Sequence, residues 1–114
     1  MEVNLLAKHD FGIMKTDPVE DKRYDEYEPE KYNCISIHDN HIEPLLNAFS
    51  QIECYWHTLA RPEKGLAYWG ITLIPPSSLD AFLIVLDKAD NVEELKGLLN
   101  KAKQEGKFVI HFGI

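Results

Sequence analysis

The sequence has little cysteine and no long apolar run, and each absence excludes a class of protein. Its two cysteines, Cys34 and Cys54, form no CxxC pair, so no disulfide framework is expected and both thiols should pack as small apolar groups. No stretch approaches the roughly 18 consecutive apolar residues that a membrane span needs. The start, MEVNLLAKHDFG, lacks the pattern of a signal peptide, so we expect a cytoplasmic protein without a membrane partner.

Basic residues are also scarce. The 12 Lys and Arg residues are outnumbered by 19 Asp and Glu residues, which gives a net charge of −7. A domain that binds nucleic acid is expected to carry a basic patch, whereas the clearest basic cluster here is the pair Lys22-Arg23, set among acids. We therefore expect no nucleic-acid partner.

The familiar motifs of catalysis and cofactor binding are missing as well. The chain has no GxSxG, no phosphate-binding Walker loop, no GxGxxG and no HExxH. These absences favour a binding protein over an enzyme, and we expect no cofactor and no bound metal.

What is present is the composition and periodicity of one globular domain, 1–114. Its length of 114 residues and 45% hydrophobic content suit a single core. Residues 33–38 alternate like a half-buried strand, and Ile42, Leu45, Leu46 and Phe49 then follow the spacing of an amphipathic helix. Residues 53–59 and 65–75 indicate a hairpin, with Pro62 and Gly65 in the connecting loop.

Two further helices and a final strand complete the pattern. Ser77 with Asp80, and Asp90 with Glu93, have the spacing of capping boxes, and Gly106 is placed to end the second helix. FVIHFGI closes the chain as a strand, while EVNLLA and FGIMK are weaker strand candidates. The order predicts an α+β domain: a mostly antiparallel sheet of four to six strands with about three helices packed on one face.

The stretch His38-Asp39-Asn40-His41 crowds polar side chains into four residues. It could hold a metal, carry acid–base chemistry, or simply join a strand to a helix. Asp and Asn are typical of strand ends and helix caps, and no further ligand-spaced residue follows. We therefore favour the junction.

Strand alternation predicts one apolar face, with Trp69 in the core beside Ile71 and Leu73. The opposite face, away from the helices, would then be uncovered. It could be plain solvated surface, a partner or homodimer contact, or a ligand groove, and its candidate residues are His38, His57, Tyr68 and His111.

Residues 17–31 form an acidic, irregular and mostly exposed segment that also contains tyrosines. Acids speed encounter with a basic protein and aromatic side chains slow its release. The candidate partner-binding residues are Tyr24, Asp25, Glu26, Tyr27 and Glu28. The sequence thus favours a small acidic protein-binding module, of inhibitor or immunity type, that masks a basic partner. The alternatives are an enzyme or small-ligand protein that uses the histidine-bearing sheet face, and a structural homodimer subunit.

The ending from Lys101 to Gly113, a helix followed by KAKQEG and a strand, resembles the end of barstar-type ribonuclease inhibitors. The resemblance covers this ending alone and assigns no role to any residue.

Overall fold

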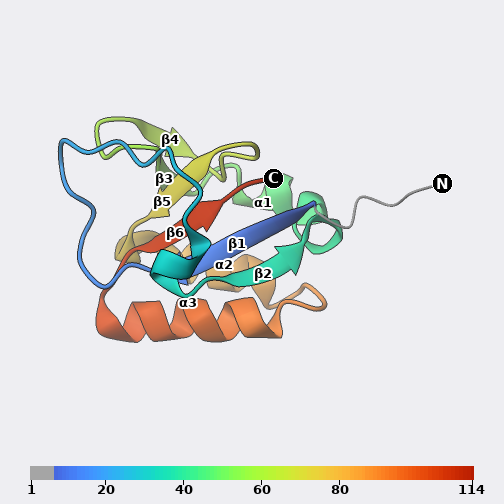
Figure 1. Ribbon diagram of the computed structural model, residues 1–114. Helices are drawn as coiled ribbons and strands as arrows, with labels where there is room; N and C mark the ends of the chain where they lie inside the picture. Colours follow the sequence, from blue (N-terminus) through green and yellow to red (C-terminus); the bar gives the residue numbers. More distant parts are fainter. Residues whose placement is uncertain (1–6) are drawn as a thin grey trace.

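A computed structural model describes residues 7–114 and has the α+β architecture that the sequence predicts (Figure 1). Six strands form one sheet in the order β2-β1-β6-β5-β3-β4, and every neighbouring pair is antiparallel. The strands are β1 Lys8–Ile13, β2 Ile35–His38, β3 Glu53–Trp56, β4 Pro62–Lys64, β5 Ile71–Ile74 and β6 Val109–Phe112. The helices are α1 Leu46–Phe49, α2 Leu79–Leu86 and α3 Glu93–Glu105, with 3-10 turns η1 Pro29–Tyr32, η2 Asp39–His41, η3 Glu43–Leu45 and η4 Pro76–Ser78.

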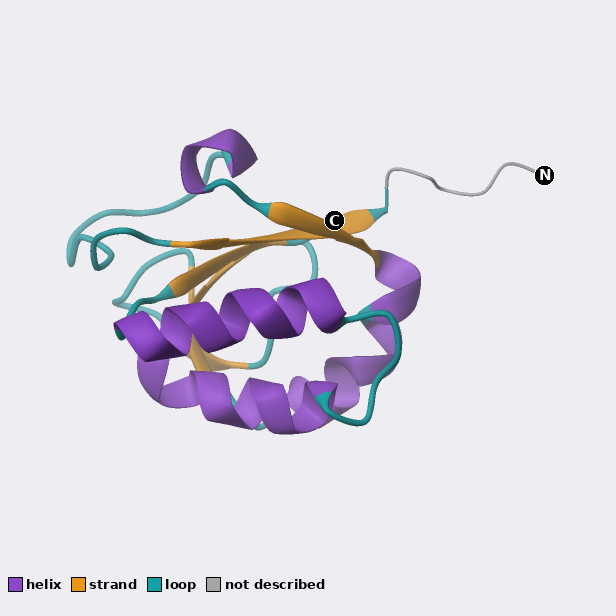
Figure 2. Cartoon of the chain, turned by 90° about the horizontal axis from the view of Figure 1, so that it is seen from below, coloured by secondary structure: helices purple, strands orange, loops and turns teal. Residues whose placement is uncertain are grey.

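Helices α2 and α3 cover one face of the sheet, as expected (Figure 2). Apolar residues of α3 and its N-cap pack into the core, since Val92, Leu95 and Leu99 are at most 1% exposed. Gly106 ends this helix with a φ of 65°, a left-handed conformation that glycine adopts without steric cost. In the described part of the chain, no helix is both long enough and apolar enough to cross a bilayer.

The opposite face of the sheet is covered too, which the sequence analysis did not anticipate. The chain between β1 and β2 crosses it and buries Met14 and Tyr24 in a second core, while η1 lies on the same side (Figure 2). The sheet contributes Ile71, Leu73, Ile110 and Phe112 to this core. The prediction of an uncovered face was therefore wrong. Strands β5 and β6 are buried along their whole length, so their side chains are buried on both faces of the sheet.

The alternation of these two strands is also opposite to the prediction. Thr72 and His111 lie on the helix face, alternating with Ile71 and Phe112 on the other. Trp69, predicted to be core, is 80% exposed. Strand β5 begins only at Ile71, so Trp69 lies in the turn before it and does not share the phase of the strand.

Several local elements differ from their predicted form. Residues 62–64, expected as a hairpin loop, form the edge strand β4 beside β3, a position where Pro62 is tolerated. The helix expected over 42–49 is a 3-10 turn followed by the single α-turn α1.

Neither predicted capping box is formed. Helices α2 and α3 begin without a side-chain cap, and their N-caps are Ser78 and Val92 rather than Ser77 and Asp90. The Ser78 hydroxyl donates to the Glu53 carbonyl oxygen at 2.5 Å. The EVNLLA strand candidate lies outside the described residues except for Ala7, and FGIMK contributes only its first three residues to β1.

Candidate functional site

A chain of hydrogen-bonded polar side chains runs through the core on the helix face. His9 Nδ1 lies 2.9 Å from His111 Nε2, and His9 Nε2 lies 2.8 Å from Asp39 Oδ1. His111 Nδ1 lies 3.0 Å from the Thr72 hydroxyl, and the Tyr68 hydroxyl donates to Asp39 Oδ2 at 2.7 Å. We call these five residues the histidine network. It links β1, β5 and β6 to the turn after β2.

One arrangement of protons satisfies the whole histidine network with both imidazoles neutral. Thr72 Oγ1 accepts the Ala67 N–H at 2.8 Å and donates its own proton to His111 Nδ1. His111 Nε2–H then donates to His9 Nδ1, and His9 Nε2–H donates to Asp39. Among the described residues, no buried side-chain nitrogen or oxygen lacks a hydrogen-bond partner.

The electrostatics agree with neutral histidines next to an ionised carboxylate. Burial lowers the pKa of His111 well below its usual value, and the nearby His9 adds to this effect. Burial also lowers the pKa of His9, although Asp39 opposes it. Burial raises the pKa of Asp39, but hydrogen bonds from Tyr68 and His9 outweigh it, and the net pKa lies below the ordinary value. The bond to Asp39 raises the pKa of Tyr68 to about 12.

The inner three residues of the histidine network are closed to substrates. His9, Thr72 and His111 are each 0% exposed, so a substrate could reach them only if the core opened. His111, expected on an open sheet face, is therefore buried on the opposite face. A fully satisfied buried network makes a core structurally specific, and we assign this role to it.

The stretch 38–41 does join a strand to a helical turn, because β2 ends at His38 and η2 begins at Asp39. The His38 Nδ1 accepts the backbone N–H of Asn40 at 3.0 Å, while His41 forms the last residue of η2. Within residues 7–114, no group of three or more His, Cys, Asp or Glu side chains is arranged to hold a metal ion.

A solvent-open pocket of about 440 Å³ lies on the face away from the helices. Its floor is one row of residues across three strands: Asp10 is paired with Phe112, and Phe112 with Ile71. His57 continues the row, because its backbone N–H donates to the Ile71 carbonyl oxygen at 3.0 Å. A volume of this size is typical of sites for small molecules.

The walls of the pocket are unusually rich in exposed apolar surface. Tyr27 and Trp69 are 58% and 80% exposed, and Ile114 is 37% exposed. The Tyr27 ring stands edge-on to Phe112 at 5.4 Å, and the Tyr68 ring supports Trp69 in a similar way at 5.1 Å. Both exposed rings are therefore held in place before any ligand arrives.

Asp10 places a buried carboxylate in this pocket. Its side chain is 3% exposed and accepts hydrogen bonds from the Tyr27 hydroxyl, at 2.5 Å, and from the Ser36 hydroxyl. The bond to Asp10 raises the pKa of Tyr27 to about 12, so this phenol stays a donor. The Lys8 ammonium group lies 3.9 Å from Asp10 Oδ1, too far for a hydrogen bond.

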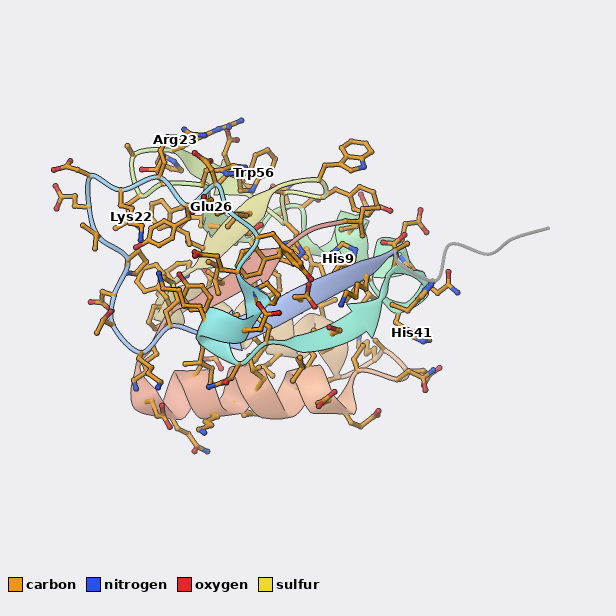
Figure 3. All side chains as sticks on the ribbon, in the orientation of Figure 1. His9, Lys22, Arg23, Glu26, His41 and Trp56 are labelled. Atoms are coloured by element: carbon orange, nitrogen blue, oxygen red, sulfur yellow. The ribbon has the colours of Figure 1, made fainter. Side chains whose placement is uncertain are left out.

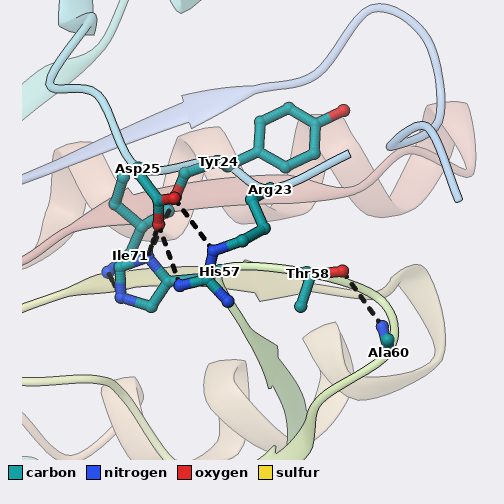
Figure 4. A network of polar contacts seen from close by, with 7 residues as sticks. All are labelled: Arg23, Tyr24, Asp25, His57, Thr58, Ala60 and Ile71. Atoms are coloured by element: carbon teal, nitrogen blue, oxygen red, sulfur yellow. Dashed lines mark hydrogen bonds and ion pairs between the residues drawn. The ribbon is translucent and has the colours of Figure 1, made fainter. Parts of the chain in front are cut away.

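His57 ties the acidic segment to the pocket floor (Figure 4). Its Nδ1 lies 2.9 Å from Asp25 Oδ1 and 3.0 Å from the Tyr24 carbonyl oxygen, and its Nε2 accepts the Ile71 N–H at 3.4 Å. His57 has a φ of 65°, which is uncommon for a residue other than glycine. The Arg23 hydrogen bond holds the pKa of Asp25 below its ordinary value.

The candidate residues of the acidic segment have different environments. Asp25 and Tyr27 line the pocket, Glu26 is exposed beside them (Figure 3), and Glu28 is half-buried. Tyr24 is only 8% exposed and its hydroxyl accepts the Val19 N–H at 2.9 Å, so it is a core residue and cannot anchor a partner.

Of the sheet-face candidates, His57 alone lines the pocket, whereas Tyr68 and His111 belong to the histidine network. Asp10, His9 and Trp69 were not among the site residues predicted from the sequence. The sequence signal for His9 and Asp10 is their position next to the apolar end of the strand KHDFGI, and Trp69 has no such signal.

The fold and the pocket together define a small α+β domain with an open aromatic and acidic site. A scan against protein-family models, a search of curated proteins and a search of solved structures each found no match for this chain.

Proposed function

We propose that the protein is a small, acidic, cytoplasmic binding module that holds a basic partner protein at the pocket floored by Asp10 and Phe112. One observation carries this proposal: three of the five exposed large hydrophobic residues among positions 7–114, namely Tyr27, Trp69 and Ile114, line this one pocket. Exposed aromatic residues gathered at one place are typical of the anchors that dominate protein interfaces.

The charge of the chain supports a basic partner. The net charge of −7 and the acids of segment 17–31 attract a positively charged surface and repel a second copy of the same chain. This favours a different, basic protein over the homodimer. In the inhibitor or immunity form of the proposal, covering that basic surface is the function itself.

The test is a comparison of two variants in native lysate. Trp69→Ala removes the most exposed aromatic of the pocket, while Ile84→Ala removes a 66% exposed apolar residue from α2, on the helix side of the sheet. We expect one partner to be retained by wild type and by Ile84→Ala and lost by Trp69→Ala, with all three proteins equally stable. Equal retention by both variants, or no partner at all, would refute the proposal.

The acidic segment should act on the rate of association. Glu26→Lys reverses an exposed charge beside the pocket, so it should slow association with the partner and leave dissociation nearly unchanged. The association of wild type should also slow as salt rises. Surface plasmon resonance with the captured partner measures both rates, and an unchanged association rate would show that the segment does not steer.

A further inference from the structure

The pocket combines a buried carboxylate with exposed aromatic faces, and this combination selects for positive charge. Asp10 is 3% exposed and its hydrogen-bond donors are neutral hydroxyls. A carboxylate removed from water attracts a cation more strongly than one at the surface. The faces of Trp and Tyr rings attract cations as well, and Trp69 and Tyr27 both stand at this site.

The other charges at the pocket are paired within the chain, and the pair that involves Asp10 is the looser one. Asp25 also lines the pocket, and its oxygens bond to Arg23 and His57. His57 accepts a backbone N–H at Nε2, so that nitrogen carries no proton and the ring donates from Nδ1. Lys8 is the remaining cation of the lining. It is 44% exposed and forms a loose ion pair with Asp10 at 3.9 Å, so a second cation would compete with it for this carboxylate.

From this geometry we infer that the pocket binds one basic side chain, arginine or lysine, of the partner protein. The cationic group lies against Trp69 and Tyr27 and takes its counter-charge from Asp10. Lys8 is the internal competitor for that carboxylate. The inference rests on the proposed binding function, and it names the group on the partner that the pocket recognises.

The experiment uses short peptides as probes and the two tryptophans as reporters. Glycine-flanked peptides with a central arginine, lysine, citrulline or aspartate are titrated into the isotope-labelled full chain. The Trp69 indole N–H lies at the pocket, whereas the Trp56 indole donates to the Gly65 carbonyl oxygen at 3.0 Å and serves as an internal control. We expect the arginine and lysine peptides to shift the Trp69 signal in a salt-sensitive way, and the citrulline and aspartate peptides to leave it in place.

Two variants sharpen the test. Trp69→Leu should weaken binding of the arginine peptide roughly two- to five-fold, measured from the shifts of the remaining pocket amides. Lys8→Met removes the competitor, so it should strengthen binding of the cationic peptides, whereas a pocket for anions would bind more weakly after this change.

Equal binding of the arginine and citrulline peptides, weaker binding of cationic peptides by Lys8→Met, or no shift with any peptide would overturn the inference. The two proposals fail separately. Loss of a captured partner by Trp69→Ala without selectivity for cationic peptides would keep the binding module and reject the cation pocket. Selectivity for cationic peptides without a captured partner would keep the cation pocket and reject the binding module.

Discussion

Acid should destabilise this protein, because His9 and His111 are buried as neutral rings while both accept protons readily in the unfolded chain. Their pKa values are lowered from 6.5 by burial, that of His111 strongly. The unfolded state therefore binds more protons than the folded state as the pH falls below about 7.5. The stabilising contribution is complete above the unfolded pKa and is lost as the pH falls through 6.5 toward the folded values.

The expected loss is large enough to measure. A histidine that titrates at 6.5 when unfolded and stays neutral when folded destabilises the protein by about 2 kcal/mol at pH 5. His111 should contribute more of this loss than His9, because Asp39 opposes the lowering of the His9 pKa. A typical domain has about 5–15 kcal/mol in total. Asp39 stays ionised over this range, since its own pKa lies below the ordinary value.

Urea unfolding at a series of pH values between 7.5 and 5 gives the free energy directly. His111→Phe should flatten the dependence on pH, while His41→Gln, outside the histidine network, should leave it unchanged. In wild type, the ring carbon shifts of His111 should remain those of a neutral imidazole at pH 5. A free energy of unfolding that does not change with pH, or a His111 ring that titrates near 6.5, would refute the assignment of neutral histidines.

Three further predictions concern stability. Trp69→Ala should change the free energy of unfolding by less than about 0.5 kcal/mol, since the side chain is 80% exposed, and a severe loss in a thermal melt would contradict its position in the turn. Tyr24→Ala should cost about 2–4 kcal/mol, because it empties part of the second core; unchanged urea unfolding would show that the segment is not packed there. Gly113→Ala should cost about 1–3 kcal/mol, since its Cβ would overlap the carbonyl oxygens of Tyr68 and Ala67. Gly97→Ala meets no atom within 4 Å and should stabilise α3 by up to about 1 kcal/mol. Equal effects of the two substitutions on the free energy of unfolding would contradict this packing.

The parts of the fold that depend on local signals could be predicted from the sequence. The spacing from Val92 to Ala102 and the glycine after it specify α3 without any knowledge of its neighbours. The antiparallel α+β class followed from the order of helix and strand patterns, and it is confirmed. The capping boxes failed because the helices begin later than the pattern placed them: the N-cap of α2 is Ser78 rather than Ser77, and that of α3 is Val92 rather than Asp90.

The direction of side chains could not be predicted for the two central strands. A strand buried on one face alternates between apolar and polar residues, and a shift of one residue reverses every assignment. Strands β5 and β6 are buried on both faces, so ITLI and VIHF contain no alternation that distinguishes the two. The direction of these side chains depends on the second layer, which the chain between β1 and β2 forms. The docking of this segment leaves no periodic signal in the sequence.

The polar residues of β1 show why the site could not be predicted from local sequence patterns. His9 and Asp10 are adjacent, so they point to opposite faces of the sheet, and because both faces are covered, each needs a partner inside the protein. His9 finds Asp39 30 positions away and His111 102 positions away, while Asp10 finds Tyr27 and Ser36 at separations of 17 and 26. No window of sequence contains these pairs. Two adjacent ionisable residues that are both buried in a strand nevertheless require such partners, because an unpaired buried charge would cost a large part of the stability of a small domain.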